Sequence, residues 1–484
     1  MQLEIATGFY QSESLPLAAQ RCINLIPVVP EASALNQRAL FDVYGLITKS
    51  LTGATINGQN RGAVVVNAVP YFINGNNLYS ISSTDVVTDH GQIEGTKRVS
   101  LAHNGQFLVI VDPGNKSYVF NNEDSSLVQI TDTDFIVSDT VSFKDGFFIF
   151  TASDGSVFFI SSLNDPLSYN ALDFGSAEVR PDKIVASHVS RNQLFIPGEE
   201  TFELFRNIGG SGFPFIRVRG GDTPKGLFAK QSIVEFDNSF VFVGGGVNEQ
   251  AAIWRMTGSA SVQKISTAAI DNAIQEFSDD EIADSFAFTK SVGGNFFAYF
   301  TFSSANIPSK TFVYDATTSA LTGELTWHER QTGVTDGRWR VNSIVDAYGE
   351  LIAGDSLDGR IGQFDKDTHN DYGDVIFRQK ASKPFTNEQT PMFVDEIKLT
   401  MESGVGLIGE EAPQIRMDFS DDGGRTFSNQ FWRTYGKIGR FERLPSWRRQ
   451  GRVPRNRVYR YTTTENVKSN ILRMDFEGEQ AVQL

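Results

Sequence analysis

The feature that most restricts the fold of this chain is a turn signal that returns along most of its length. Asn, Asp or Gly residues stand directly before apolar residues that alternate in the manner of a strand, as in "NGQFLVIV" and "DGFFIFTASDGSVFFI". Turn residues of this kind between alternating apolar runs are strong local signals for a β-hairpin. The signal stands at Asn74, Asn104, Asp145, Asn192, Asn238, Gly294 and Gly349.

The spacing of these turns predicts a closed repeat. From Asn104 to Asn238 the signal recurs at roughly 40–50 residues, the period of β-propeller blades built from several short strands. The later intervals are longer and leave room for insertions. One blade cannot bury its faces alone, so the unit must repeat and close. A series of unrelated β-meanders is the alternative, and the sequence does not choose between six and seven blades.

Three regions follow from the patterning, and the predicted class is all-β. Residues 1–60 contain several prolines and little periodicity, which indicates an extended N-terminal arm that packs along the rest. Residues 61–372 are predicted to form a β-propeller-like domain, with a short helical insertion near 266–286 where apolar residues have helical spacing. Strict alternation in "QIRMDFS" and similar stretches predicts a C-terminal antiparallel β-sandwich over residues 375–484.

Several functional classes lack their signals in this sequence. The five histidines show no metal-ligand spacing, and neither a phosphate-binding loop nor a nucleophile elbow occurs. We therefore predict no catalytic residue, no metal, no cofactor and no enzymatic activity. No apolar run approaches the roughly 18 residues that span a bilayer. A single cysteine, Cys22, and an N-terminus without a signal-peptide pattern favour synthesis in a reducing cytoplasm.

"SDDGGRTF" resembles the Asp box, a hairpin-turn motif of sialidases and other β-propeller glycosidases. In such proteins the motif recurs in several blades, whereas here one copy stands outside the repeat. Ser and Asp side chains suit bonds to backbone N–H groups across a turn, so a structural role is favoured. A glycan-binding or glycan-hydrolysing β-propeller remains the alternative function. The motif residues are Ser420, Asp422, Gly424, Thr426 and Phe427.

Charge is distributed unevenly along the chain. The net charge is −15, yet residues 425–460 hold eleven Lys or Arg and one acid, so this segment carries +10 and the remainder −25. The segment could bind nucleic-acid phosphates, meet an acidic surface of a neighbouring subunit, or be a solvated loop. Self-association is favoured because the complementary charge lies on the same chain. The candidate contact residues are Arg443, Arg448, Arg449, Arg452, Arg455 and Arg457.

Three stretches carry a resemblance to a known family. "QRCINLIPVVPEASA" is similar to the N-terminal arm of tail-hub proteins of podoviruses, which are also called packaged-DNA stabilisation proteins. Residues 179–245 resemble the central segment of that family, with an "x-PD-x-I" entry, "E-x-F-x-x-x-G" and a "KG" turn. "SDDGGRTFSN" and "WRRQGRVPRN" resemble the C-terminal part of related tail proteins of short-tailed double-stranded DNA bacteriophages.

This resemblance implies a fold and a role. Family members are nozzle-like virion proteins with a propeller-like domain and further β domains. They form a homo-oligomeric, hexameric ring below the head-to-tail connector and its adaptor proteins. The ring continues the DNA channel, so that genomic double-stranded DNA passes without sequence-specific binding, and it helps to retain the packaged genome. It also anchors tail fibres, tailspikes, a needle or a plug. The expected location is the virion tail, after synthesis in the host bacterial cytoplasm.

Overall fold

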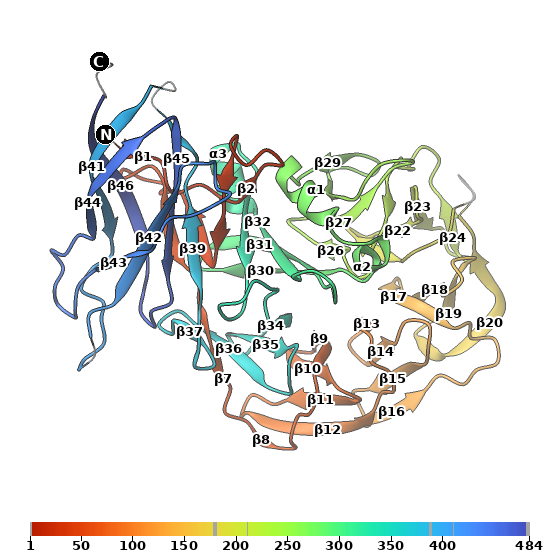
Figure 1. Ribbon diagram of the computed structural model, residues 1–484. Coiled ribbons are helices and arrows are strands. Elements are labelled where there is room, and N and C mark those ends of the chain that lie inside the picture. The colour runs from red at the N-terminus through yellow and green to blue at the C-terminus, as the bar shows by residue number, and fades with distance from the viewer. Residues whose placement is uncertain (1, 178–181, 211, 387–389, 410, 481–484) are drawn as a thin grey trace.

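In the computed structural model, which describes residues 2–177, 182–210, 212–386, 390–409 and 411–480, seven β-sheets surround one axis (Figure 1). Neighbouring inner strands contact each other around most of this axis, as the blades of a propeller do. The inner strands of the seven blades are, in chain order, β9 (Asn60–Val66), β13 (Ser100–His103), β17 (Ser138–Lys144), β21 (His188–Ser190), β26 (Val234–Glu235), β30 (Phe286–Val292) and β34 (Val341–Ala347).

Each blade continues outward by antiparallel pairing, except that β8 (Thr52–Gly53) joins blade 1 parallel to β12 (Val86–Gln92). Blade 1 adds β10 (Val69–Asn74), β11 (Asn77–Ile81), β12 and β8. Blade 2 adds β14 (Phe107–Val111), β15 (Ser117–Asn121) and β16 (Ser126–Gln129). Blade 3 adds β18 (Phe147–Ala152), β19 (Phe158–Ser162) and β20 (Asp165–Gly175). Blade 4 adds β22 (Gln193–Pro197), β23 (Phe202–Asn207) and β24 (Phe215–Arg217). Blade 5 adds β25 (Gly226–Leu227), β27 (Phe240–Gly245), β28 (Ala252–Met256) and β29 (Val262–Lys264). Blade 6 adds β31 (Asn295–Phe302), β32 (Lys310–Asp315) and β33 (Thr326–Arg330). Blade 7 adds β35 (Glu350–Asp355) and β36 (Ile361–Asp365).

The turn signals mark one recurring position in the blades. At Asp145–Gly146 both φ angles are positive, 51° and 87°, as a type I′ turn requires. Six of the seven signals lie in the turn between the inner strand and its neighbour. Blade 1 differs, because Asn74 lies in its second hairpin and its inner turn is Asn67–Ala68. A repeated inner hairpin therefore explains the spacing.

The N-terminal segment supplies strands to several sheets. β7 (Gly45–Thr48) pairs with β36 and so adds the outer strand of blade 7, and the short β8 joins blade 1. One blade is thus completed by a strand from the other end of the chain, which closes the propeller. Short strands β37 (Asn370–Asp371) and β38 (Asp374–Val375) extend the same sheet. The domain boundaries expected near residues 60 and 372–375 stay predictions.

A second unit packs two sheets face to face around a separate core. One sheet holds β44 (Ser446–Val453), β41 (Met392–Met401), β46 (Ile471–Gln480), β6 (Ala39–Asp42), β5 (Leu25–Val28) and β1 (Gln2–Leu3). The facing strands are β4 (Cys22–Ile23), β39 (Arg378–Ala381), β45 (Asn456–Thr463), β42 (Gln414–Ser420), β43 (Phe431–Thr434) and β40 (Phe385–Thr386). Trp447, Tyr461 and Met474 are buried between the two layers. The predicted all-β class, a propeller with a C-terminal sandwich, is confirmed.

One sheet links the two units. β33 of blade 6 pairs with β4, which pairs with β39 of the sandwich, so a ten-stranded sheet runs from β30 at the propeller axis to β43. Beside this junction lie the short hairpin β2 (Tyr10–Gln11) and β3 (Ala19–Gln20) and the helix α3 (Ala316–Thr322). Two further helices, α1 (Ala268–Ile274) and α2 (Asp279–Ala283), lie between blades 5 and 6. Ser278 and Glu281 form a capping box at α2.

Candidate functional site

The Asp-box residues form a closed hydrogen-bonded turn after β42. The Ser420 hydroxyl donates to the Asp422 carboxylate at 2.6 Å and accepts from the Gly424 N–H at 2.8 Å. The same carboxylate accepts from the backbone N–H groups of Arg425 and Thr426 at 2.9 and 3.0 Å, and from the Thr426 hydroxyl at 2.6 Å. These hydrogen bonds, that from Ser420 foremost, hold the pKa of Asp422 well below its ordinary value.

This turn packs on the N-terminal segment. Gly423 has a φ of +79°, and a Cβ there would lie 2.7 Å from Cα of Pro16. Phe427 packs against a small cluster that includes Ala19. The guanidinium of Arg460 lies 3.6 Å from the centre of the Phe427 ring. All five motif residues thus serve the turn and its packing, and their carboxylate is already engaged by the chain's own donors.

Five of the six candidate arginines are exposed on the outer end of the sandwich. β44 is the edge strand of its sheet, and it bulges near Arg449, whose φ is +56°. Arg448 pairs with Glu396 at 3.1 Å, but its side chain is still 78% exposed. Charged residues and bulges on an edge strand prevent pairing with other strands. The exposed members are Arg443, Arg448, Arg449, Arg452 and Arg455.

Arg457 differs from the other five candidates because it is buried. Its side chain is 2% exposed, and its guanidinium donates twice to the Asp421 carboxylate, at 2.6 and 2.8 Å. It also donates to the backbone carbonyls of Gln450 and Arg452. The guanidinium lies 3.8 Å from the centre of the Phe419 ring. Arg457 therefore ties the Asp-box loop to the β44–β45 hairpin instead of facing solvent.

Exposed apolar side chains lie beside these arginines, and their place in the site was not predicted from the sequence. The β43 residues Phe431 and Trp432 are 39% and 46% exposed, and Phe441 in the following loop is 74% exposed. This segment lies beside β44, since Trp447 donates to the Phe431 carbonyl at 2.8 Å. Basic and apolar residues alternate in "WRTYGKIGRFERL", which was a usable signal. We call this surface the sandwich rim and define it as Arg443, Arg448, Arg449, Arg452, Arg455, Phe431, Trp432, Ile438, Phe441 and Leu444.

No group of three or more His, Cys, Asp or Glu side chains in the described ranges is placed to hold a metal ion. None of the helices described is long and apolar enough to cross a membrane. Cys22 is fully buried on β4, and this burial raises the pKa of its thiol to about 11. The thiol is therefore protonated at neutral pH.

Comparison with protein families gives two matches that divide the chain between them. The family described as "Bacteriophage P22 Gp10, beta-propeller" matches residues 1–369, and that described as "Bacteriophage P22 Gp10, beta-sandwich" matches residues 378–479. A search of curated proteins found no match.

Solved structures show distant similarity. The extracellular domain of the putative one component system BT4673 from B. thetaiotaomicron is 10% identical, with a TM-score of 0.39, and the match covers 77% of this chain and 43% of that chain. The N-terminal domain of Nup159 is 10% identical (TM-score 0.40; 70% and 98% covered). The RRP9 WD40 repeats are 12% identical (TM-score 0.37; 67% and 99% covered).

Proposed function

The chain belongs to the bacteriophage P22 Gp10 family, a family of phage stabilisation proteins, and from this premise we propose that it forms the tail hub, or nozzle, of a short-tailed phage. In this role a hexameric ring of copies lies below the head-to-tail connector and continues the DNA channel. The ring helps to retain the packaged genome and anchors tail fibres, spikes or a plug. The chain then acts as a structural part of the virion tail without enzymatic activity.

The sandwich rim is the observation that carries this proposal. It combines five exposed arginines with exposed aromatic and aliphatic side chains, whereas the chain outside residues 425–460 carries −25. A few residues, most often Trp, Tyr and Arg, supply most of the energy of protein contacts, and complementary charge steers association and fixes the register. The rim therefore suits contact with an acidic surface of a neighbouring copy.

The geometry of the chain suits a ring. β43 and β44 lie at the end of the molecule away from blades 3 and 4, so the rim and the far side of the propeller are separated by the long axis of the molecule (Figure 1). A heterologous contact between two different surfaces generates a ring when the rotation closes. A rim that meets the propeller side of the next copy is such a contact.

The acidic balance of the remaining chain suits the passage of DNA. Phosphate contacts from Lys and Arg dominate the affinity of proteins for DNA. A channel lined mainly by acidic residues would hold DNA weakly and let it slide. This lining is part of the proposal, and a structure of the assembled ring with a basic bore would contradict it.

The test compares charge reversal at the rim with charge reversal elsewhere. The triple variant Arg448→Glu, Arg449→Glu, Arg452→Glu is expected to abolish rings in negative-stain images and to leave monomers in light scattering. High salt should weaken wild-type rings, because the Debye length falls from about 10 Å at 0.1 M to about 3 Å at 1 M. The control variant, Lys264→Glu with Lys366→Glu, reverses exposed lysines of blades 5 and 7 that lie outside both surfaces of the proposed contact.

Two outcomes would overturn the assembly role of the rim. One is that the triple variant forms rings as well as the control does. The other is that the triple variant loses DNA binding while its rings stay intact, which assigns the arginines to phosphate contact. Sugar hydrolysis by the wild-type chain that is lost in Asp422→Ala would instead support the glycan-active alternative.

A further inference from the structure

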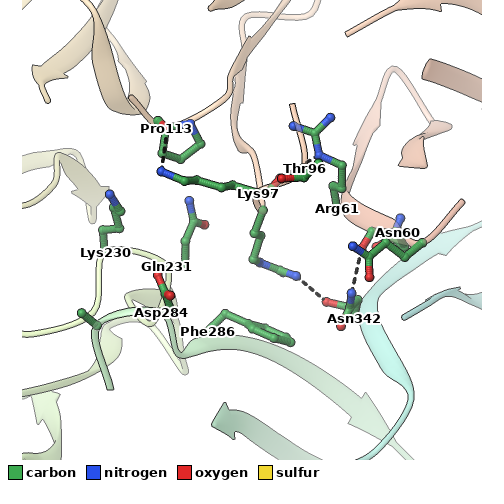
Figure 2. A pocket seen from close by; sticks show the side chains of 13 residues that line it. Asn60, Arg61, Thr96, Lys97, Pro113, Lys230, Gln231, Asp284, Phe286 and Asn342 are labelled. Atoms are coloured by element: carbon green, nitrogen blue, oxygen red, sulfur yellow. Dashed lines mark hydrogen bonds between the residues drawn. The ribbon is translucent and has the colours of Figure 1, made fainter. Parts of the chain in front are cut away.

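A pocket of about 280 Å³ lies at one end of the propeller axis. Its walls come from the beginnings of inner strands: Asn60 and Arg61 begin β9, Phe286 begins β30, and Asn342 lies at the start of β34. Figure 2 shows the lining side chains, several of which end in nitrogen. Lys97, Arg98, Lys230, Gln231 and Asp284 also line the pocket.

Two of the four cations in this pocket are neutralised by neighbouring carboxylates. Arg61 pairs with the buried Asp112 at 2.7 Å, and Lys230 pairs with Asp139 at 2.6 Å. Lys97 and Arg98 have no carboxylate partner within the described ranges. The lining contains one carboxylate, that of Asp284, which is exposed to solvent at the end of α2. The pocket therefore has an excess of positive charge.

Arg98 is held in place by contacts that do not neutralise it. Its Nη1 donates to the Asn342 carbonyl at 2.7 Å, and its guanidinium lies 4.3 Å from the centre of the Phe286 ring. A second guanidinium, that of Arg338, lies 5.3 Å from the same ring centre. Burial, and then the charge of Arg338, lowers the pKa of Arg98 to about 9. Two like charges near one ring repel each other, and a bound anion would relieve this repulsion.

Gln231 adds an unused donor. Its side-chain Nε2 is buried and has no hydrogen-bond partner, although a buried polar atom without a partner is costly and uncommon in proteins. Gln231 lines the pocket, and Figure 2 shows its side chain ending in the same part of the view as those of Lys97 and Lys230. Lys97 itself makes one long hydrogen bond, at 3.4 Å, to the Pro113 carbonyl.

We propose that this axial pocket binds a phosphoryl anion, with Lys97, Arg98 and Gln231 as its donors. The Lys97 ammonium and the Arg98 guanidinium come from consecutive residues before β13, and the Gln231 amide comes from the segment before β26. A tetrahedral oxyanion offers an acceptor oxygen to each of the three donors. A planar carboxylate offers only two oxygens and matches this arrangement less well. Inorganic phosphate or the phosphate group of a nucleotide could supply the same chemistry.

The experiment uses isothermal titration of the full chain with sodium phosphate, with sodium chloride at equal ionic strength as reference. Binding of phosphate but not chloride is expected. Lys97→Gln should weaken phosphate binding at least tenfold, since a charge-assisted hydrogen bond contributes about 1.5–3 kcal/mol and about 1.4 kcal/mol is tenfold. Lys437→Gln, on the sandwich, should bind as the wild type does. A nucleoside monophosphate titrated in parallel distinguishes a free phosphate site from a nucleotide site.

Gln231→Met keeps the test valid if Lys97→Gln is unstable. It removes a donor that has no partner in the protein, so the thermal midpoint without phosphate should stay equal or rise, while phosphate binding weakens. The proposal is overturned if neither phosphate nor the nucleotide binds more tightly than chloride. It is also overturned if Lys97→Gln and Gln231→Met both bind phosphate as tightly as the wild type.

Discussion

Replacing Arg457 by Met should destabilise the sandwich, whereas the same replacement at Arg452 should not. The Arg457 side chain is 2% exposed and makes two hydrogen bonds to Asp421, at 2.6 and 2.8 Å, and two to backbone carbonyls. Met retains an apolar contact with the Phe419 ring but removes all of these donors. Arg452 is exposed, and no carboxylate in the described ranges pairs with it.

The size of the effect follows from this geometry. Removing one partner of a buried ion pair costs about 3–5 kcal/mol. Asp421 keeps 35% of its side chain exposed, so water can solvate its carboxylate once Arg457 is gone. We therefore expect a loss near the lower end, about 3 kcal/mol of unfolding free energy. For Arg452→Met the change should stay within about 0.5 kcal/mol, as for most surface substitutions.

Urea unfolding of the full chain, followed by tryptophan fluorescence, measures the difference. Trp447 is fully buried in the sandwich core and reports on this unit. With a urea slope of about 1–3 kcal/mol per M, a loss of about 3 kcal/mol lowers the midpoint by about 1–3 M. Equal midpoints for Arg457→Met and Arg452→Met would refute the structural role assigned to Arg457.

Three further predictions concern single side chains. Burial lowers the pKa of Lys380 from 10.5 to about 8, so between these pH values the unfolded chain binds more protons than the folded chain. The unfolding free energy, measured by urea titration, should therefore rise by about 1.5 kcal/mol from pH 8 to pH 9.5, and Lys380→Met should remove this rise. Hydrogen bonds lower the pKa of Asp422 below its ordinary value of 3.8, so the ionised carboxylate stabilises the fold at neutral pH, and this effect is lost as the pH falls below 3.8. Asp422→Ala should therefore reduce the thermal midpoint at pH 7 and change it less at pH 2.5. Gly423→Ala places a Cβ against Pro16 at a positive φ and should cost about 1–3 kcal/mol, with faster proteolysis of the N-terminal segment than in Gly439→Ala, where nothing lies nearby.

The propeller could be predicted because its signal is local. A type I′ turn requires two positive φ angles, which Asn, Asp and Gly adopt at low cost. Asp145, Gly146 and Asn238 are such residues, and each has a positive φ. Blade 1 shows the limit of this reasoning, since its inner turn is Asn67–Ala68, and Ala at φ 65° gives no composition signal. The number of blades could not be counted from the turns alone.

Closure of the propeller depends on pairings between distant segments, and these leave little trace in the sequence. β7 is four residues long, and it lies more than 300 residues before its partner β36. Its residues Ile47 and Thr48 are exposed, so no alternating pattern marks it as a strand. The short strands β4 to β6 join the sandwich through similar long-range pairing, and no local sequence pattern specifies it.

The candidate site was predictable in composition but not in exposure. The arginines of residues 425–460 stand out as a charge excess. Arg455 and Arg457 lie on either side of Asn456, yet Arg455 is exposed and Arg457 is buried. The axial pocket joins residues from blades that are far apart along the chain, such as Lys97 and Gln231. Each is unremarkable in its own segment, so only closure of the ring of blades brings them together.

The ten-stranded sheet from β30 to β43 has a mechanical consequence. Its backbone hydrogen bonds form an unbroken series from the propeller axis to the edge of the sandwich, and β4 is the strand through which both units are joined. A pull between the rim and the propeller axis runs across the strands, so it loads these interstrand hydrogen bonds in series. In the ring that we propose, tension carried by this sheet would cross from one unit to the other at Cys22–Ile23.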